Sequence, residues 1–153
     1  MTITIRNAVS DVDLTAAYAL IAALADHENA RRYLRISETA FVEGAASRPP
    51  RFHVMVAEAQ GDIVGAMTYT SRFHIWSGTD VLILDDLYVA PAARGQGVGS
   101  QFLNAIGQIA KKRNLPVKWQ VNTDNEDAIR LYKRIGANYS ERGVCFWLPE
   151  NIS

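Results

Sequence analysis

The sequence contains only one cysteine, Cys145, in 153 residues. A single cysteine excludes an internal disulfide and is typical of a reducing compartment, so we expect a cytoplasmic protein. We interpret Cys145 as a small apolar residue of a C-terminal strand rather than as a nucleophile. The chain also lacks an apolar run near the roughly 18 residues that a membrane-spanning helix needs. Its first residues, MTITIRNAVSDVD, lack the basic start and apolar core of a signal peptide, so we expect no membrane partner.

Net charge is missing as well, because sixteen basic residues balance sixteen acidic residues. A balanced chain has no general attraction to polyanions, so we expect no nucleic acid partner. The basic cluster Lys111-Lys112-Arg113 is local, and we interpret it as contacting a nucleotide phosphate or solvent. His27 and His74 are far apart and have no neighbouring cysteine or second histidine, which gives no basis for a metal site.

With 48% hydrophobic residues and no linker-like segment, the chain is expected to form a single domain over residues 1–153. Alternating or apolar runs predict strands at 2–7, 52–59, 62–73, 80–89, 116–122 and 144–148. Serine caps at Ser10 and Ser37 predict one helix to about residue 30 and another through 37–46, and helical periodicity predicts two more at 97–114 and 125–135. This order indicates an α/β protein with a mixed sheet.

The segment Arg94-Gly95-Gln96-Gly97-Val98-Gly99 has glycine at three alternate positions between a strand and a helix. Such a loop favours an anion, because its backbone N–H groups converge and the helix dipole is positive there. The spacing differs from the dinucleotide fingerprint G-x-G-x-x-G, and no Lys-Ser or Lys-Thr follows as in a Walker loop. From Leu87 through Thr123 the chain has no Asp or Glu but five basic residues. A phosphate site is therefore predicted, and the alternative is a tight turn before a solvated basic helix end.

Two motifs, in this order, resemble those of the GNAT N-acetyltransferases. The first is Arg-x-x-Gly-x-Gly at Arg94–Gly99, after a strand ending Leu87-Tyr88-Val89. The second is Asn-x-x-Ala-x-x-x-Tyr-x-x-x-Gly-Ala at Asn125–Ala137. The resemblance covers nearly the whole chain and implies the GNAT fold, in which about four helices flank a mixed sheet of six to seven strands that is splayed in the middle. It also implies acetyl-CoA as the co-substrate and no metal.

The resemblance further implies which residues hold the cofactor. The pyrophosphate would bind backbone N–H groups from Gly95 to Ser100, and the pantetheine arm would pair with the main chain of Leu87 and Val89 as an added strand does. The expected cofactor-binding set is Leu87, Tyr88, Val89, Arg94, Gly95, Gln96, Gly97, Val98, Gly99, Ser100, Asn125, Ala128 and Tyr132.

Acetyl transfer to an amine needs a deprotonated nitrogen, a polarised thioester carbonyl and a proton for the leaving thiolate. Two substrates that are held together can react directly, without a covalent enzyme intermediate. The resemblance makes Tyr132 the acid, two helical turns after Asn125, and the N–H of Val89 the carbonyl contact. Asp85 is the expected base, directly or through water. Strand alternation predicts that Asp85 and Asp86 point to opposite faces. The alternatives without a catalytic role are that Tyr132 is a residue of the apolar core and that the two carboxylates face water at a sheet edge.

Within the family, the chain is most similar to the diamine and polyamine group, which includes the thialysine type. The matching segments are Leu84-Asp85-Asp86-Leu87, the turn Trp76-Ser77-Gly78, and His27-Glu28. Glu28 and the two aspartates would form an acidic pocket for a second ammonium group. The expected substrate-binding set is His27, Glu28, Trp76, Asp85 and Asp86.

Two departures from that group leave other acceptors open. An acid expected before the Trp turn is missing from Phe73-His74-Ile75-Trp76, and Arg142 stands where the group prefers an acid. An arginine there can hold a substrate carboxylate. The alternatives are an amino acid, an aminoglycoside, a protein lysine or N-terminus, or a CoA-binding regulatory module without turnover. The resemblance also implies a homodimer, often formed through C-terminal strands, for which Phe146 and Trp147 are candidates.

Overall fold

The computed structural model describes residues 2–153, which form two compact units. The first unit ends at Trp119, and the second covers Gln120–Ser153. The second unit contains α4 (Glu126–Arg134) and the short helix η3 (Pro149–Asn151). None of the helices in residues 2–153 combines the length and the hydropathy that crossing a bilayer requires.

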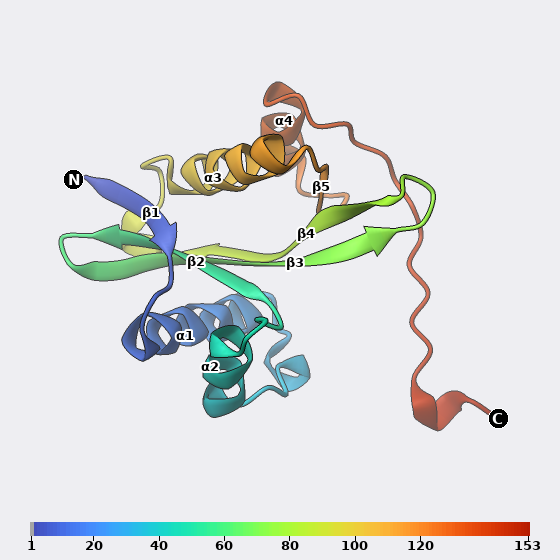
Figure 1. Ribbon diagram of the computed structural model, residues 1–153, viewed down its shortest axis with the longest axis horizontal. Coiled ribbons are helices and arrows are strands. Elements are labelled where there is room, and N and C mark those ends of the chain that lie inside the picture. Colours follow the sequence, from blue (N-terminus) through green and yellow to red (C-terminus); the bar gives the residue numbers. More distant parts are fainter. Residues whose placement is uncertain (1) are drawn as a thin grey trace. The chain divides into compact units, whose positions relative to one another are not determined.

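The first unit is built on a five-stranded sheet with helices on both faces (Figure 1). Its strands lie side by side in sequence order: β1 (Ile3–Asn7), β2 (His53–Ala59), β3 (Asp62–His74), β4 (Thr79–Val89) and β5 (Val117–Lys118). The first four strands are antiparallel to their neighbours, whereas β5 runs parallel to β4. One face carries α1 (Asp11–His27), η1 (Arg31–Tyr33) and α2 (Glu38–Ala46), and the other carries α3 (Val98–Arg113), which follows η2 (Pro91–Ala93). The α/β class with four α-helices is confirmed.

The serine caps are confirmed at both N-terminal helices. The Ser10 hydroxyl accepts the N–H of Asp13 at 3.1 Å, and the Ser37 hydroxyl accepts the N–H of Ala40 at the same distance. A side-chain acceptor at this position satisfies one of the free donors of the first helical turn. α1 ends at His27 rather than near residue 30, because Asn29 adopts a left-handed φ of 54° that terminates a helix.

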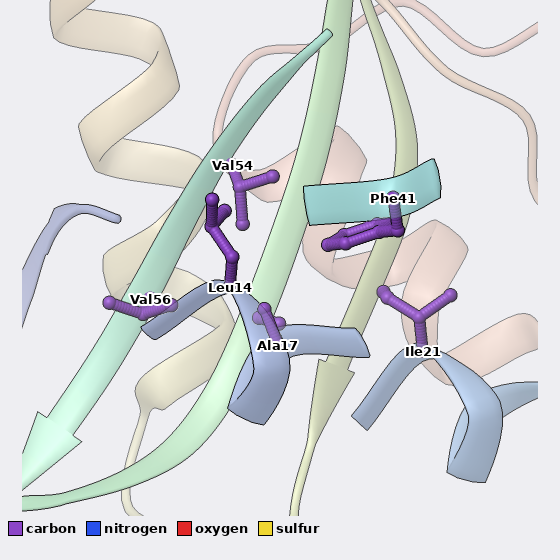
Figure 2. Close-up of a cluster of buried hydrophobic side chains, with 7 residues drawn as sticks. Leu14, Ala17, Ile21, Phe41, Val54 and Val56 are labelled. Atoms are coloured by element: carbon purple, nitrogen blue, oxygen red, sulfur yellow. The ribbon is translucent and has the colours of Figure 1, made fainter. Parts of the chain in front are cut away.

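Two apolar layers fix the sheet between the helices. Figure 2 shows the layer under α1 and α2, in which side chains of both helices meet those of β2: Leu14, Ala17, Ile21, Phe41, Val54 and Val56. On the opposite face, Phe102 of α3 packs so closely on β3 that a Cβ on Gly65 would lie 2.9 Å from its ring. Glycine at position 65 therefore lets α3, and the loop that precedes it, lie close to the sheet.

Two strand predictions are wrong, and with them the expected six to seven strands. Residues 144–148 form no strand among the described residues, and only Val117–Lys118 of the run 116–122 pairs with a neighbour. An apolar run predicts a strand without naming its partner, and a strand exists only where a partner satisfies its backbone groups. The C-terminal segment instead exposes 74% of Val144 and 86% of Phe146. Cys145, expected within that strand, is exposed too.

A partly buried ion-pair network joins β1, β2 and the start of α1. The guanidinium of Arg6 binds Asp13 through two nitrogens, at 2.8 and 2.9 Å, and reaches Glu58 at 2.7 Å. Asp13 also accepts the N–H of Val9 at 2.9 Å. The hydrogen bonds from Arg6 hold the pKa of the Asp13 carboxyl well below its usual range.

Asp13→Asn is expected to lower the free energy of unfolding by about 3 kcal/mol, because it leaves Arg6 partly buried without its main counter-charge. The lowered pKa makes this stabilisation pH-dependent. It is fully present above the unfolded-state pKa of about 3.9 and is lost as the pH falls toward the lower folded-state value. Urea unfolding from pH 7 to pH 3 tests both parts, with the exposed Asp11→Asn as the control. Equal stability of the two variants at pH 7 would contradict this role of Asp13.

Candidate functional site

The glycine loop connects the end of β4 to the start of α3. Gly95 and Gly97 have φ angles of 74° and 76°, in the left-handed region that favours glycine. Gly97 is the N-cap of α3, and no side chain of the described residues caps that helix start. The space around both α-carbons is open, since a Cβ at either position would meet nothing within 4 Å. This sixteen-residue helix therefore begins with N–H groups that lack a side-chain cap, beside open space at Gly95 and Gly97, an arrangement that suits a pyrophosphate group.

The edge of β4 beside this loop is open. β5 pairs with β4 only at Leu82 and Ile83, although β4 continues to Val89. The N–H of Ala90 donates to Val64 of β3 at 2.8 Å. Because main-chain groups alternate in direction along a strand, those of Val89 and Leu87 point away from β3, toward the open edge. This edge offers backbone donors and acceptors to an extended ligand.

Arg94 contacts a backbone carbonyl and an aromatic ring at the end of β4. Its Nε donates to the carbonyl oxygen of Val89 at 3.0 Å, and its guanidinium lies 5.2 Å from the centre of the Tyr88 ring. The side chain thus lies along the open edge of β4, whereas the backbone of Arg94 begins the glycine loop.

A β-bulge places Asp85 and Asp86 on the same face of the sheet. Thr68 of β3 pairs with Asp86, but the next residue, Tyr69, pairs with Leu84, so Asp85 is an extra residue in β4. The carboxylate of Asp86 accepts the hydroxyl of Thr68 at 2.6 Å, and that of Asp85 lies 3.5 Å from the hydroxyl of Thr70.

Thr68 and Thr70 are two positions apart on one strand and share a face, so the two carboxylates do as well. The prediction of opposite faces is wrong, because the bulge breaks the alternation. This is the face that carries α1, since Val54 pairs with Thr68 and belongs to the core under that helix.

Burial and a neighbouring charge change the acidity of Asp85. Partial removal from water raises the pKa of its carboxyl above the ordinary value, the neighbouring Asp86 raises it further, and the Thr70 hydroxyl opposes both. Asp85 still keeps part of its surface in water, and Asp86 is half-buried. The pair therefore combines Asp86, a carboxylate tethered by a buried threonine, with Asp85, a second carboxylate that is open to solvent and has a raised pKa.

The other expected substrate residues lie in two places. His27 and Glu28 are exposed at the end of α1, on the face of the sheet that carries the acids. Trp76 lies at the tip of the β3–β4 hairpin and is 95% exposed. Asp85 lies six positions after Thr79 along the extended strand, or about 20 Å away. The structure does not bring Trp76 together with the acids of the same chain.

Three expected residues lie in the second unit. Asn125 is the N-cap of α4, and its side-chain oxygen accepts the N–H of Ala128 at 3.2 Å. Tyr132 is half-buried, two turns further along the same helix. The motif that predicted a cofactor contact at Asn125 thus also contains a helix cap, which the sequence analysis missed.

Thr68 and Thr70, which the sequence analysis did not identify, contact the two candidate acids. Their signal was present, because the alternating pair Thr-Tyr-Thr lies in a strand expected to form a hairpin with the strand of the two acids. Recognising them requires the hairpin register, which the bulge shifts. In residues 2–153, no cluster of three metal-ligating side chains occurs.

Comparison with known proteins agrees with this geometry. Residues 15–137 match the model of the acetyltransferase (GNAT) family. The thialysine N-epsilon-acetyltransferase of Bos taurus is 32% identical over 127 residues, which cover 77% of this chain and 74% of the relative. The aminoalkylphosphonate N-acetyltransferase of Salmonella typhimurium is 29% identical over 139 residues, or 89% of this chain and 85% of that protein.

A solved structure adds the fold. An aminoglycoside acetyltransferase from an uncultured soil metagenomic sample superposes with a TM-score of 0.76, at 20% identity, over 95% of both chains. GNAT acetyltransferases use acetyl-CoA as co-substrate. This chain therefore belongs to the GNAT family, as an acetyl-transferring enzyme similar to the polyamine and thialysine group.

Proposed function

We propose that the protein transfers the acetyl group of acetyl-CoA to a primary amine of a small, diamine- or polyamine-like molecule. The observation that carries this proposal is the pair of carboxylates, Asp85 and Asp86, on one face of β4 beside its open edge. Two acids on one face suit an acceptor with more than one ammonium group, because one acid can bind a charge while the other takes a proton. Glu28, at the end of α1 on the same face, is the expected third acid.

In this mechanism the amine attacks the thioester directly, while both substrates are bound. The main chain of Leu87 and Val89 pairs with the pantetheine arm, and the Val89 N–H polarises the thioester carbonyl. Asp85 accepts the ammonium proton, directly or through water. Tyr132 protonates the leaving thiolate and is reprotonated by the second proton, which the nitrogen loses as the amide forms. The proposed reaction needs one group from each unit, Asp85 and Tyr132. Residues 1–153 therefore act as a single domain in this proposal.

Asp85→Asn is expected to lower kcat/KM at neutral pH about 100-fold, because the amide cannot accept the ammonium proton. In the wild type the rate should fall as the pH drops through the raised pKa of Asp85, and this limb should be absent from the variant. The raised pKa of Asp85 has the opposite effect on the stability of the fold. A carboxyl whose pKa is raised by folding destabilises the fold once the pH exceeds that pKa, so the variant should be at least as stable as the wild type at pH 7.

The matched control is Asp80→Asn, in the same strand. The Asp80 carboxylate accepts the Ser71 hydroxyl at 2.8 Å, and the pairing register puts it on the opposite face of the sheet. A wild-type pH profile is expected for this variant. If the two variants lost activity equally, Asp85 would not be the base.

An amine with an anionic group is the second candidate acceptor. The segment after α1 carries Arg31, Arg32 and Arg35. Arg31 pairs with Asp26 at 2.7 Å, and Arg32 lies over the Tyr33 ring. The relative from Salmonella typhimurium is named for an aminoalkylphosphonate. Arginine suits carboxylates and phosphonates through its paired donors.

An acceptor panel decides between these classes. Thiol release from acetyl-CoA is measured with diamines, polyamines, thialysine, amino acids, aminoalkylphosphonates, aminoglycosides and peptides. The proposal predicts the highest kcat/KM for a diamine, polyamine or thialysine, and a loss of that preference in the double variant Asp85→Asn, Glu28→Gln. Activity on spermidine that ignores the double substitution would contradict the acidic pocket.

A cytoplasmic homodimer is also part of the proposal. Large apolar side chains are exposed at the hairpin tip and in the C-terminal segment: Phe73, Ile75, Trp76, Val144, Phe146 and Trp147. Exposed large apolar side chains in each of these segments favour association. Since Trp76 lies far from the acids of its own chain, a second copy is the way for it to reach an acceptor site. Sedimentation equilibrium tests the assembly, and a monomer at micromolar concentration would contradict it.

A further inference from the structure

We infer that Arg94 makes the cofactor site selective for thioesters that carry phosphate, because its own side chain occupies the strand edge that a pantetheine arm needs. The inference rests on the proposed pairing of the pantetheine arm with Leu87 and Val89. It adds a specificity-determining role for Arg94 beyond attraction to the pyrophosphate.

The competition arises at the carbonyl oxygen of Val89. This oxygen points to the open edge of β4, and the Nε of Arg94 already donates to it at 3.0 Å. A strand-like ligand gains affinity from the same main-chain groups, so its amide must take the place of the guanidinium. The Tyr88 ring, 5.2 Å from the guanidinium, holds the arginine there by a cation–π contact.

Phosphate offers Arg94 a better partner. The residue opens the glycine loop and stands four positions before Val98, the first residue of α3, whose free N–H groups form the anion site. A phosphate bound there gives the guanidinium paired, charge-assisted hydrogen bonds that are stronger than one bond to a neutral carbonyl. When CoA binds, Arg94 therefore exchanges its hydrogen bond to Val89 for contacts with the CoA phosphates. Pantetheine has no phosphate, so it must displace Arg94 from Val89 without that compensation.

The test is Arg94→Met, which keeps the length of the side chain and removes its donors. Pantetheine and CoA are titrated separately by ligand-observed NMR and calorimetry, and kcat/KM is measured for acetyl-pantetheine and acetyl-CoA. The contacts to Val89 and Tyr88 together are worth about tenfold in an equilibrium constant. The variant should therefore bind and use the pantetheine compounds about tenfold better than the wild type. The dissociation constant of the variant for CoA should rise by about tenfold or more, because the phosphate contact is lost.

Inorganic pyrophosphate gives a second readout without catalysis. In the wild type, pyrophosphate should raise the affinity for pantetheine, because it draws Arg94 away from Val89. In Arg94→Met this effect should vanish. Arg72→Met, which removes an exposed arginine of β3, controls for the change in net charge and should behave as the wild type does.

The outcomes separate this inference from the proposed function. A wild type that binds no CoA would overturn the proposed function. If the wild type binds CoA but Arg94→Met neither improves pantetheine binding and use nor loses the pyrophosphate effect, the inference alone is overturned.

Discussion

Tyr132→Phe is expected to lower kcat for acetyl transfer about 100-fold and to leave the dissociation constant of acetyl-CoA nearly unchanged. In the proposed mechanism the hydroxyl gives its proton to the departing thiolate, so it matters only as the C–S bond breaks. Removing one oxygen atom from a half-buried ring of α4 keeps the apolar part of the side chain. The loss should be smallest for thioesters whose thiol is most acidic, since such a leaving group needs the proton least.

The matched control is Tyr139→Phe, in the same unit. The Tyr139 hydroxyl donates to Glu141 at 3.0 Å, and its ring lies 5.2 Å from the ammonium group of Lys133. Removing this hydroxyl should leave kcat within about twofold of the wild type, as for a surface substitution outside the site. A full-rate Tyr132→Phe enzyme would remove Tyr132 from the mechanism. A rate loss shared by both variants would indicate a general disturbance of the unit.

Gly97→Val is expected to abolish acetyl-CoA binding, with a loss of affinity of about 100-fold or more, while the protein stays folded. A β-branched residue resists the φ of 76° that Gly97 adopts, so the loop must take another path and the first N–H groups of α3 turn away from the phosphates. The side chain would also project into the open space that the ligand is expected to occupy.

Gly61→Val imposes a comparable strain away from the loop. Gly61 has a φ of 87° in the turn between β2 and β3, and a Cβ there also meets nothing within 4 Å. Each variant should lose about 1–2 kcal/mol of stability, but only Gly97→Val should lose acetyl-CoA affinity in a calorimetric titration. Normal affinity of a folded Gly97→Val protein would contradict the phosphate site at this loop.

Local signals account for the part of the fold that could be predicted. The serine caps and the helix expected at 97–114 each depend on residues close together in the chain. Such signals act through short-range sterics and hydrogen bonds, so they can be identified in the sequence. The strands of the β2–β3–β4 meander could be predicted for the same reason.

Long-range pairing explains what could not be predicted. Residues 144–148 have the composition of a strand, but composition does not supply a neighbour. The bulge at Asp85 is a mismatch between two strands, so only their register reveals it. The two acids could be identified from the sequence as candidates, but their common face, and the threonines that bind them, could not.

The bulge connects the fold to the proposed chemistry. Regular alternation would have turned one acid toward α3, and the extra residue brings both to the face of α1. The same irregularity lies just beyond the point where pairing of β4 with β5 stops. A single change in strand register thus accompanies both the open edge proposed for the cofactor and the paired acids proposed for the amine.

The most direct test of this account is a stoichiometric measurement on the wild-type enzyme. The protein is incubated with acetyl-CoA and a diamine or thialysine, and CoA thiol and acetylated amine are quantified together by mass spectrometry. The account predicts one acetylated amine for each thiol released, at a rate that depends on the amine and with no acetylated enzyme. Thiol release that is independent of the amine, or no transfer to any amine, would contradict it.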